Sequence, residues 1–207
     1  ISAQPMPVAS LIAAKSGDHE RACGWFRRVG ERWPGSGLNG HARLELGLSL
    51  LALGREDDAR GALIEASGCD DDRVAVAALR RLGGLASARG AHGEAAEMFG
   101  DAASRGGGAG ALDSRLRMAQ SYADAGMNDE ADRSFTALIE EDGGAVGAEA
   151  LARRGLLRIA SGLEEEGMQD VDAALERVPH GSLRGALLLA RAGRMGEEDA
   201  EVARRLL

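Results

Sequence analysis

The sequence has few aromatic residues, few cysteines and no long apolar run. Aromatic residues make up 3% of its 207 residues, and it contains two cysteines, too few for a disulfide-rich scaffold. No apolar run approaches the roughly 20 residues that a membrane-spanning helix requires. These scarcities exclude a disulfide-stapled domain and give no indication of a transmembrane segment.

The charge balance is acidic, with a formal net charge of -8 at pH 7. A general nucleic-acid-binding protein needs a basic surface to attract phosphates, so we expect no nucleic-acid partner. Hydrophobic residues make up 44% of the chain, too many for a disordered tail. The motifs G-x-S-x-G, H-E-x-x-H and G-x-x-x-x-G-K-[ST] are absent, which leaves the common hydrolase, metalloprotease and P-loop classes without support.

What the sequence does contain is an internal repeat. Five glycines follow one another at spacings of 37, 36, 36 and 36 residues, at Gly17, Gly54, Gly90, Gly126 and Gly162. A small residue lies five positions after each glycine, at Ala22, Ala59, Ala95, Ala131 and Gly167. A large apolar residue lies four positions further on, at Phe26, Leu63, Phe99, Phe135 and Val171. Three position classes that share one period indicate a repeat architecture.

Each repeat is predicted to be a helical hairpin. Leu46, Leu50 and Leu53 recur at helical spacing before Gly54, and apolar residues recur in the same way after it. A left-handed glycine ends the first helix, and the carboxylates that follow complement the positive end of the second helix. Small residues at the crossing let the hairpin close, at Gly47, Gly83, Ala119 and Gly155. We therefore predict an all-α stack of about twelve short helices with essentially no sheet.

The repeat resembles the tetratricopeptide repeat. In the third complete unit, Met118, Ala119 and Tyr122, followed by Ala131 and Phe135, match the spacing L-G-x2-Y and A-x3-F of that motif. The tryptophan of the motif is missing, and its position holds Arg43, Leu79, Arg115 or Leu151. The 36-residue step is also longer than the usual ~34. The related Sel1-like repeat has a similar length, but it carries extra residues between the glycine and the alanine.

The resemblance implies a right-handed α-solenoid of about six helix-turn-helix repeats, forming one domain over residues 1–207. The repeats are expected at about 5–34, 38–71, 73–107, 110–143, 146–179 and 181–207. In the last unit Ala200 is a candidate for the small residue and Arg204 replaces the large apolar one, which fits either a polar cap or truncation of a longer array. The glycines at 106–108 form either a loose loop between repeats or a hinge between two half-solenoids.

Side chains capable of chemistry are scattered along the chain. The histidines show no i, i+4 spacing, so we predict solvated surface residues and no metal or cofactor site at His19, His41, His92 and His180. Cys23 is expected to be a small buried residue, and Cys69 to lie at a helix end. The run at 70–72, three aspartates, is expected to cap the following helix rather than to bind calcium. We therefore predict that the chain is not an enzyme.

A row of arginines is the main candidate binding site. Arg81, Arg117 and Arg153 recur every 36 residues, each nine positions before a hairpin glycine. In the family that the chain resembles, the first helices line a concave groove, and this position commonly faces it. Guanidinium groups there are suited to gripping carboxylates; alternatively, they pair with neighbouring carboxylates or solvate the outer face. Further candidates for partner binding are Arg80, Gln120, Arg43 and Trp25.

These features predict a non-catalytic scaffold that binds a partner protein or peptide, acidic in character, as a subunit of a larger bacterial hetero-oligomeric complex. The alternative is the sensor or regulatory portion of a larger signalling or transcription-control protein. An enzyme subunit whose chemistry lies outside the repeats is a third possibility. The link W-P-G-S at 33–36 and the start at Ile1 favour a periplasmic or envelope location, with the cytoplasm as the alternative.

Overall fold

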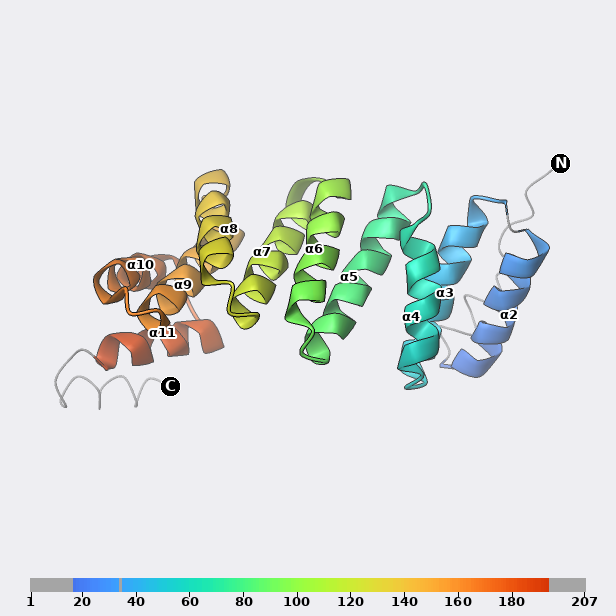
Figure 1. The fold of residues 1–207 in the computed structure, drawn as a ribbon, viewed down its shortest axis with the longest axis horizontal. Coiled ribbons are helices and arrows are strands. Elements are labelled where there is room, and N and C mark those ends of the chain that lie inside the picture. The colour runs from blue at the N-terminus through green and yellow to red at the C-terminus, as the bar shows by residue number, and fades with distance from the viewer. Residues whose placement is uncertain (1–16, 34, 194–207) are drawn as a thin grey trace. The chain divides into compact units, whose positions relative to one another are not determined.

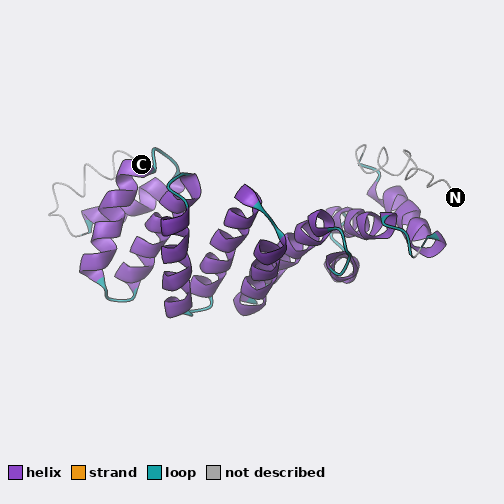
Figure 2. Ribbon diagram, turned by 90° about the horizontal axis from the view of Figure 1, so that it is seen from above, coloured by secondary structure: helices purple, strands orange, loops and turns teal. Residues whose placement is uncertain are grey.

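The computed structural model describes residues 17–33 and 35–193, and every regular element in these ranges is a helix (Figure 1). No strand occurs in this part of the chain (Figure 2), which confirms the predicted all-α class. The ten described helices are α2 His19–Arg32, α3 Leu38–Ala52, α4 Glu56–Ser67, α5 Asp72–Ala88, α6 His92–Arg105, α7 Gly108–Asp124, α8 Asn128–Glu141, α9 Ala145–Ala160, α10 Glu164–Arg177 and α11 Ser182–Ala192.

The terminal hairpins are described only in part. Helix α2 belongs to the expected unit at 5–34, and α11 opens the expected unit at 181–207. Residues Ala200 and Arg204, the candidates for a polar cap, lie outside the described residues.

The chain divides into two compact units. The first comprises Ile1–Gly90 and Glu97–Ala111, and the second comprises Ala91–Ala96 and Leu112–Leu207. The division crosses the start of α7, close to the glycines at 106–108. One continuous domain and a glycine hinge both stay predictions.

Within each unit, neighbouring helices pack in sequence order. In the first unit α2 contacts α3, α3 contacts α4 and α4 contacts α5, and α3 also reaches α5. In the second unit α8 contacts α9, α9 contacts α10 and α10 contacts α11, and α9 also reaches α11. Figure 1 shows the partners of a hairpin, such as α3 and α4, as adjacent rods. First helices of successive hairpins therefore touch one another, as stacking of helical hairpins requires.

Glycine follows the first helix of the four hairpins that begin with α3, α5, α7 and α9. The five repeat glycines all have a left-handed backbone, with φ between 72° at Gly54 and 84° at Gly162. At Gly54 the glycine N–H donates to the Leu51 carbonyl at 2.9 Å, and the Arg55 N–H donates to the Leu50 carbonyl at 2.9 Å. These two bonds satisfy the last carbonyl groups of α3, and only glycine adopts this φ without steric cost. The predicted left-handed stop is confirmed.

Small residues at the helix crossings lie close against the second helix of the same hairpin. A Cβ added to Gly47 would lie 2.7 Å from Leu63 Cγ, and one added to Gly83 would lie 2.9 Å from the Phe99 ring. In the fifth hairpin, a Cβ on Gly155 would lie 3.0 Å from the backbone oxygen of Gly167. The distances at Gly47 and Gly83 are too short for a real Cβ contact and the distance at Gly155 is tighter than most, so glycine lets each pair of helices approach. The prediction that small residues let the hairpin close is confirmed at Gly47, Gly83 and Gly155.

The large repeat residues form the core of each unit. Phe26 in the first unit and Phe135 in the second are fully buried among leucines and alanines of adjacent helices. Cys23 lies in the same apolar cluster as Phe26, and burial raises the pKa of its thiol. Both cysteines are free thiols. Cys23 is therefore the small buried core residue that the sequence predicts.

Aspartates begin two of the first helices. Asp71 Oδ1 accepts the Arg73 N–H at 2.9 Å at the start of α5. Asp142 accepts the N–H groups of Gly144 and Gly147, at 3.1 and 2.9 Å, at the start of α9. These backbone hydrogen bonds hold the pKa of both carboxyl groups below its ordinary value. The capping role predicted for the run of aspartates is confirmed at Asp71.

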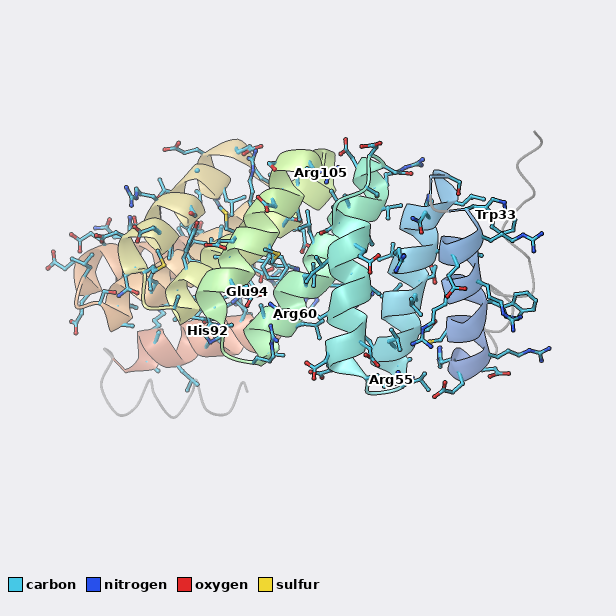
Figure 3. All side chains as sticks on the ribbon, turned by 45° about the vertical axis from the view of Figure 1, so that its right-hand side comes forward. Trp33, Arg55, Arg60, His92, Glu94 and Arg105 are labelled. Carbon is cyan, nitrogen blue, oxygen red and sulfur yellow. The ribbon has the colours of Figure 1, made fainter. Side chains whose placement is uncertain are left out.

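Arg105 of α6 closes the connection between α4 and α5 in the first unit (Figure 3). Its Nη1 and Nη2 groups donate to the carbonyl oxygens of Ser67 and Cys69, both at 2.8 Å. Its Nε group donates to Asp72 Oδ1 at 3.0 Å. The Ser67 carbonyl at the end of α4 and the Cys69 carbonyl in the connection after it are thus satisfied by a cation from the next hairpin.

Candidate functional site

The first helices of two successive hairpins, α7 and α9, share a polar face in the second unit. Arg153 of α9 donates from Nη1 to Gln120 Oε1 of α7. The same guanidinium donates to Glu149 Oε1, at 2.9 Å from Nε and 2.6 Å from Nη2. Gln120 in turn donates to Asp124 Oδ1 at 2.8 Å. We call the residues of this face the first-helix row; they are Asp113, Arg117, Gln120, Asp124, Glu149 and Arg153.

The remaining arginine of the row also has a carboxylate partner. Arg117 is exposed and donates from Nε to Asp113 Oδ2, one turn earlier, at 3.1 Å. Arg117 and Arg153 therefore each pair with a neighbouring carboxylate, which is the alternative to partner binding that the sequence analysis left open. Arg81 is exposed on α5 of the first unit, and the residue one turn before it, Ala77, offers no carboxylate. Whether these arginines bind a partner stays a prediction.

Other predicted site residues lie elsewhere. Arg43 of α3 forms an ion pair with Glu65 of α4, at 2.7 Å, and lies within 3.4 Å of where a Cβ on Gly30 of α2 would stand. It therefore points toward second helices and not along a row of first helices. Trp25 is half-buried on α2, with the Arg28 guanidinium 5.5 Å from its ring centroid. Arg80 is half-buried on α5.

A cluster of charged side chains that the sequence analysis missed joins α8, α9 and α10. Arg154 donates from Nε and Nη2 to the two oxygens of Asp170, both at 2.8 Å, and from Nη1 to Thr136 Oγ1 at 2.8 Å. Arg158 donates from Nη1 to Asp170 at 3.1 Å, and from Nε and Nη2 to Asp132 at 2.6 and 3.1 Å. We call Asp132, Arg154, Arg158 and Asp170 the ion network.

Burial makes the ion network unusual. The Asp170 side chain is only 9% exposed, and that of Arg154 is 13% exposed. The hydrogen bond to Asp132, with the nearby charges of Asp132 and Asp170, raises the pKa of Arg158. A buried carboxylate is tolerated when two guanidinium groups satisfy its oxygens. The network therefore replaces apolar packing between these helices with fixed, directional bonds.

The repeat register contains the signal for this network. Arg154 occupies the position that holds Leu46, Leu82 and Met118 in the three preceding repeats. Arg158 occupies the position of Leu50, Ala86 and Tyr122. Charged residues at two positions that are otherwise apolar or aromatic call for a buried counter-ion, and Asp170 supplies it.

A pocket of about 560 Å³ lies beside the network. Arg158 and Asp132 reach its wall from the network, and Leu157 and Leu163 supply its apolar lining. The remaining lining residues are Asn128, Asp129, Arg133, Ser161 and Glu166. All of them come from α8, α9, α10 and the α9–α10 turn, so the pocket belongs wholly to the second unit.

A second pocket of about 400 Å³ lies in the first unit, between the α2–α3 and α4–α5 connections. Cys69 lines it, and its thiol donates to the Asp71 carbonyl at 3.5 Å. Within residues 17–33 and 35–193, no group of three or more His, Cys, Asp or Glu side chains is placed to hold a metal ion. No described helix is both long enough and apolar enough to cross a membrane.

Comparison with known proteins identifies the repeat. Residues 113–144, which cover most of α7 and α8, match the family model of the tetratricopeptide repeat. The chain has the tetratricopeptide-repeat fold. Among solved structures it is similar to the C-terminal part of a tetratricopeptide repeat-containing protein from Cytophaga hutchinsonii, at 12% identity and a TM-score of 0.66, covering 94% of this chain and 75% of that one.

A second similar structure supports the same tetratricopeptide-repeat fold. It is a chain of nearly identical repeats of this kind from Podosopora anserina, at 14% identity and a TM-score of 0.62, covering 91% of this chain and 95% of that one. Identities this low establish the fold and nothing about partners. No curated protein sequence matches the chain.

Proposed function

We propose that the chain is a non-catalytic docking module that binds a segment of a partner protein on the exposed face of its first helices. The tetratricopeptide-repeat fold is a protein-interaction fold. The observation that carries the proposal is the bond from Arg153 to Gln120, because it makes α7 and α9 one continuous surface. Polar side chains then recur along that surface at a fixed step, which suits an extended or helical peptide.

The partner that suits the first-helix row carries carboxylates. Arg117 and Arg153 are paired with Asp113 and Glu149 in arrangements that remain partly exposed to solvent. Exposed ion pairs of this kind are worth about 0–1 kcal/mol, so a partner carboxylate can take the place of either acidic side chain at little cost. A guanidinium presents a planar fork to such a group and can hold it through two hydrogen bonds.

The test uses the full chain and a fluorescent peptide that is rich in Asp and Glu and ends in a free carboxylate. Replacing Arg117 and Arg153 together with alanine is expected to weaken binding about tenfold, since each charge-assisted hydrogen bond contributes ~1.5–3 kcal/mol before exchange with Asp113 and Glu149. The matched control is Arg27→Ala with Arg177→Ala, which removes the same charge from exposed positions on second helices.

An amide-terminated peptide with Asn and Gln in place of the acids should bind weakly to every variant. Equal affinity of the acidic peptide for the row variant and the control variant would contradict the proposal, as would failure of the acidic peptide to bind the unaltered chain. We further propose that the module serves within a hetero-oligomeric complex. In size-exclusion chromatography, a partner protein is then expected to co-elute with the unaltered chain but not with the variant that lacks Arg117 and Arg153.

A further inference from the structure

Two large apolar side chains are exposed at the hairpin turns of the second unit. Met127 and Leu163 each follow a left-handed glycine, 36 residues apart, and are 40% and 51% exposed. In a glycine-stopped helix this position commonly packs back on the last turn. The turns lie together, because Asn128 Nδ2 donates to Ser161 Oγ at 3.2 Å. An edge of the unit thus presents apolar surface to solvent at two adjacent turns.

The pocket of about 560 Å³ opens at this edge and is built partly from Leu157 and Leu163. Its wall is held rigidly on one side, because Arg158 is bonded to both Asp132 and Asp170. A site whose walls are already ordered loses little conformational freedom when a ligand enters. The ion network therefore acts as a fixed support for the pocket.

The charge of the pocket is acidic once its internal pairs are counted. Arg158 is neutralised within the network, and Arg133 donates to Glu130 at 3.3 Å and to the main-chain oxygen of Asp129 at 3.2 Å. The carboxylates of Asp129 and Glu166 are exposed. Glu166 lies near enough to Arg158 for its charge to help raise the pKa of that guanidinium, but Arg158 donates its hydrogen bonds to Asp132 and Asp170. Two carboxylates next to an apolar floor remain for a ligand to use.

We infer that this pocket, which we call the turn-edge pocket, docks a short segment of a partner protein in which Lys or Arg lies next to a large apolar residue. The apolar side chain would cover Leu157 and Leu163, removing their exposed surface from water. The cation would reach Asp129 and Glu166, forming charge-assisted hydrogen bonds. Charge complementarity selects this occupant, since an acidic or phosphorylated segment would be repelled by the same carboxylates. The site is separate from the first-helix row and prefers the opposite charge.

The experiment titrates the full chain with three fluorescent peptides of equal length. One combines Lys or Arg with leucine, the second has the same cations with serine in place of leucine, and the third has the leucines with Glu in place of the cations. The first peptide is expected to bind best. In spectra of the methyl groups, the signals of Leu163 and Met127 are expected to shift as it is added.

Matched variants locate the binding. Asp129→Asn with Glu166→Gln removes two pocket charges and is expected to weaken the first peptide about tenfold, which corresponds to ~1.4 kcal/mol. Glu140→Gln with Glu176→Gln removes two exposed charges from the same two helices outside the pocket and is expected to leave affinity unchanged.

An apolar pair of variants tests the other half of the site. Leu163→Ala is expected to weaken the first peptide, whereas Ile64→Ala, which removes a comparably exposed side chain (53%) on α4, is not. The inference is overturned if the peptide does not bind, if pocket and control variants behave alike, or if affinity falls only when Arg117 and Arg153 are replaced. The last result would place the basic peptide on the first-helix row and leave the turn-edge pocket without a ligand.

Discussion

Arg154 and Asp170 form a two-point ion pair in which Nε and Nη2 each lie 2.8 Å from a separate carboxylate oxygen. The pair joins the first and second helices of one hairpin at positions that are elsewhere filled by apolar side chains or serine. Arg158 then extends the contact from Asp170 to Asp132 of α8, the second helix of the preceding hairpin. One buried carboxylate thereby fixes three helices relative to one another.

Loss of the Asp170 charge should strongly destabilise the second unit. In Asp170→Asn, Arg154 loses its carboxylate partner in a site where Asp170 was only 9% exposed, whereas Arg158 keeps its bonds to Asp132. Breaking a buried pair from one side costs ~3–5 kcal/mol. We expect a fall of about this size in the free energy of unfolding, measured by urea denaturation followed by circular dichroism.

Asp172→Asn is the control for that measurement. Asp172 is also on α10, but it is 60% exposed and lies 3.6 Å from Arg191. Its replacement is expected to cost less than ~1 kcal/mol, as exposed pairs do. Similar losses in the two variants would show that burial of the network contributes nothing to stability.

Replacing the entire network should have the opposite outcome. Exchanging a buried ion cluster for well-packed apolar residues is often neutral or stabilising by ~1–4 kcal/mol. The replacements are the residues found at the equivalent positions one repeat earlier in the chain. The free energy of unfolding of this variant is again measured by urea denaturation. A large loss of stability would mean that the network does more than substitute for packing. The combined variant is Arg154→Met, Arg158→Tyr, Asp170→Ser and Asp132→Ala.

The helical hairpins were predictable from sequence because their determinants are local. A left-handed glycine, a small residue and a large apolar residue at fixed offsets define each hairpin. Gly54, Ala59 and Leu63 play these parts in the repeat at 38–71. The structure confirms all three roles. A motif in which each residue acts through backbone conformation or volume can be recognised without knowing where other segments lie.

The candidate sites were less predictable because they depend on which side chains meet across helices. Asp113 and Glu149 lie one turn before Arg117 and Arg153 on the same helices, so these pairs are visible in the sequence. What the spacing does not reveal is the bond from Arg153 across to Gln120 of α7. Arg43 was a further candidate for partner binding, yet its ion pair with Glu65 directs it toward a second helix. Side-chain direction around a helix, and not position along the chain, decides these pairings.

The ion network is an intermediate case. Arg154 and Arg158 break the apolar register of their unit, which is visible in the sequence as a departure from the repeat. Their partner Asp170 lies on the other helix of the hairpin, where it replaces Ser134 of the preceding unit. A comparison of equivalent positions between repeats, for charge as well as for size, therefore indicates that a buried arginine and a buried carboxylate form an ion pair.

Adjacent glycines on α5 give a sharp test of the helix crossings. A Cβ on Gly83 would lie 2.9 Å from the Phe99 ring, whereas one on Gly84 would meet nothing within 4 Å. Gly83→Ala is therefore expected to destabilise the chain by ~1–3 kcal/mol through overpacking. Gly84→Ala should stabilise it by ~0.5–1 kcal/mol, because alanine loses less backbone freedom in a helix.

Thermal denaturation of the two glycine variants, side by side, measures the difference directly. Both changes add one methyl group to the same helix, so helix propensity alone predicts that both variants are more stable. Opposite shifts in melting temperature identify the crossing as the cause. Stabilisation of both variants would show that the ring of Phe99 moves aside without cost.

The cap of α9 should make stability depend on pH in a defined window. Hydrogen bonds from Gly147 and Gly144 hold the pKa of Asp142 below 3.8 in the folded chain. A depressed pKa means that the charged form stabilises the fold at pH values above 3.8, and that this contribution is lost as the pH falls through the lower, folded value. Asp142→Asn keeps a capping oxygen but carries no charge, so it should be less stable than the unaltered chain at neutral pH. The two chains should converge in urea midpoint below the folded pKa, and a gap between them that stays constant across the whole acid range would show that the Asp142 charge does not stabilise the cap.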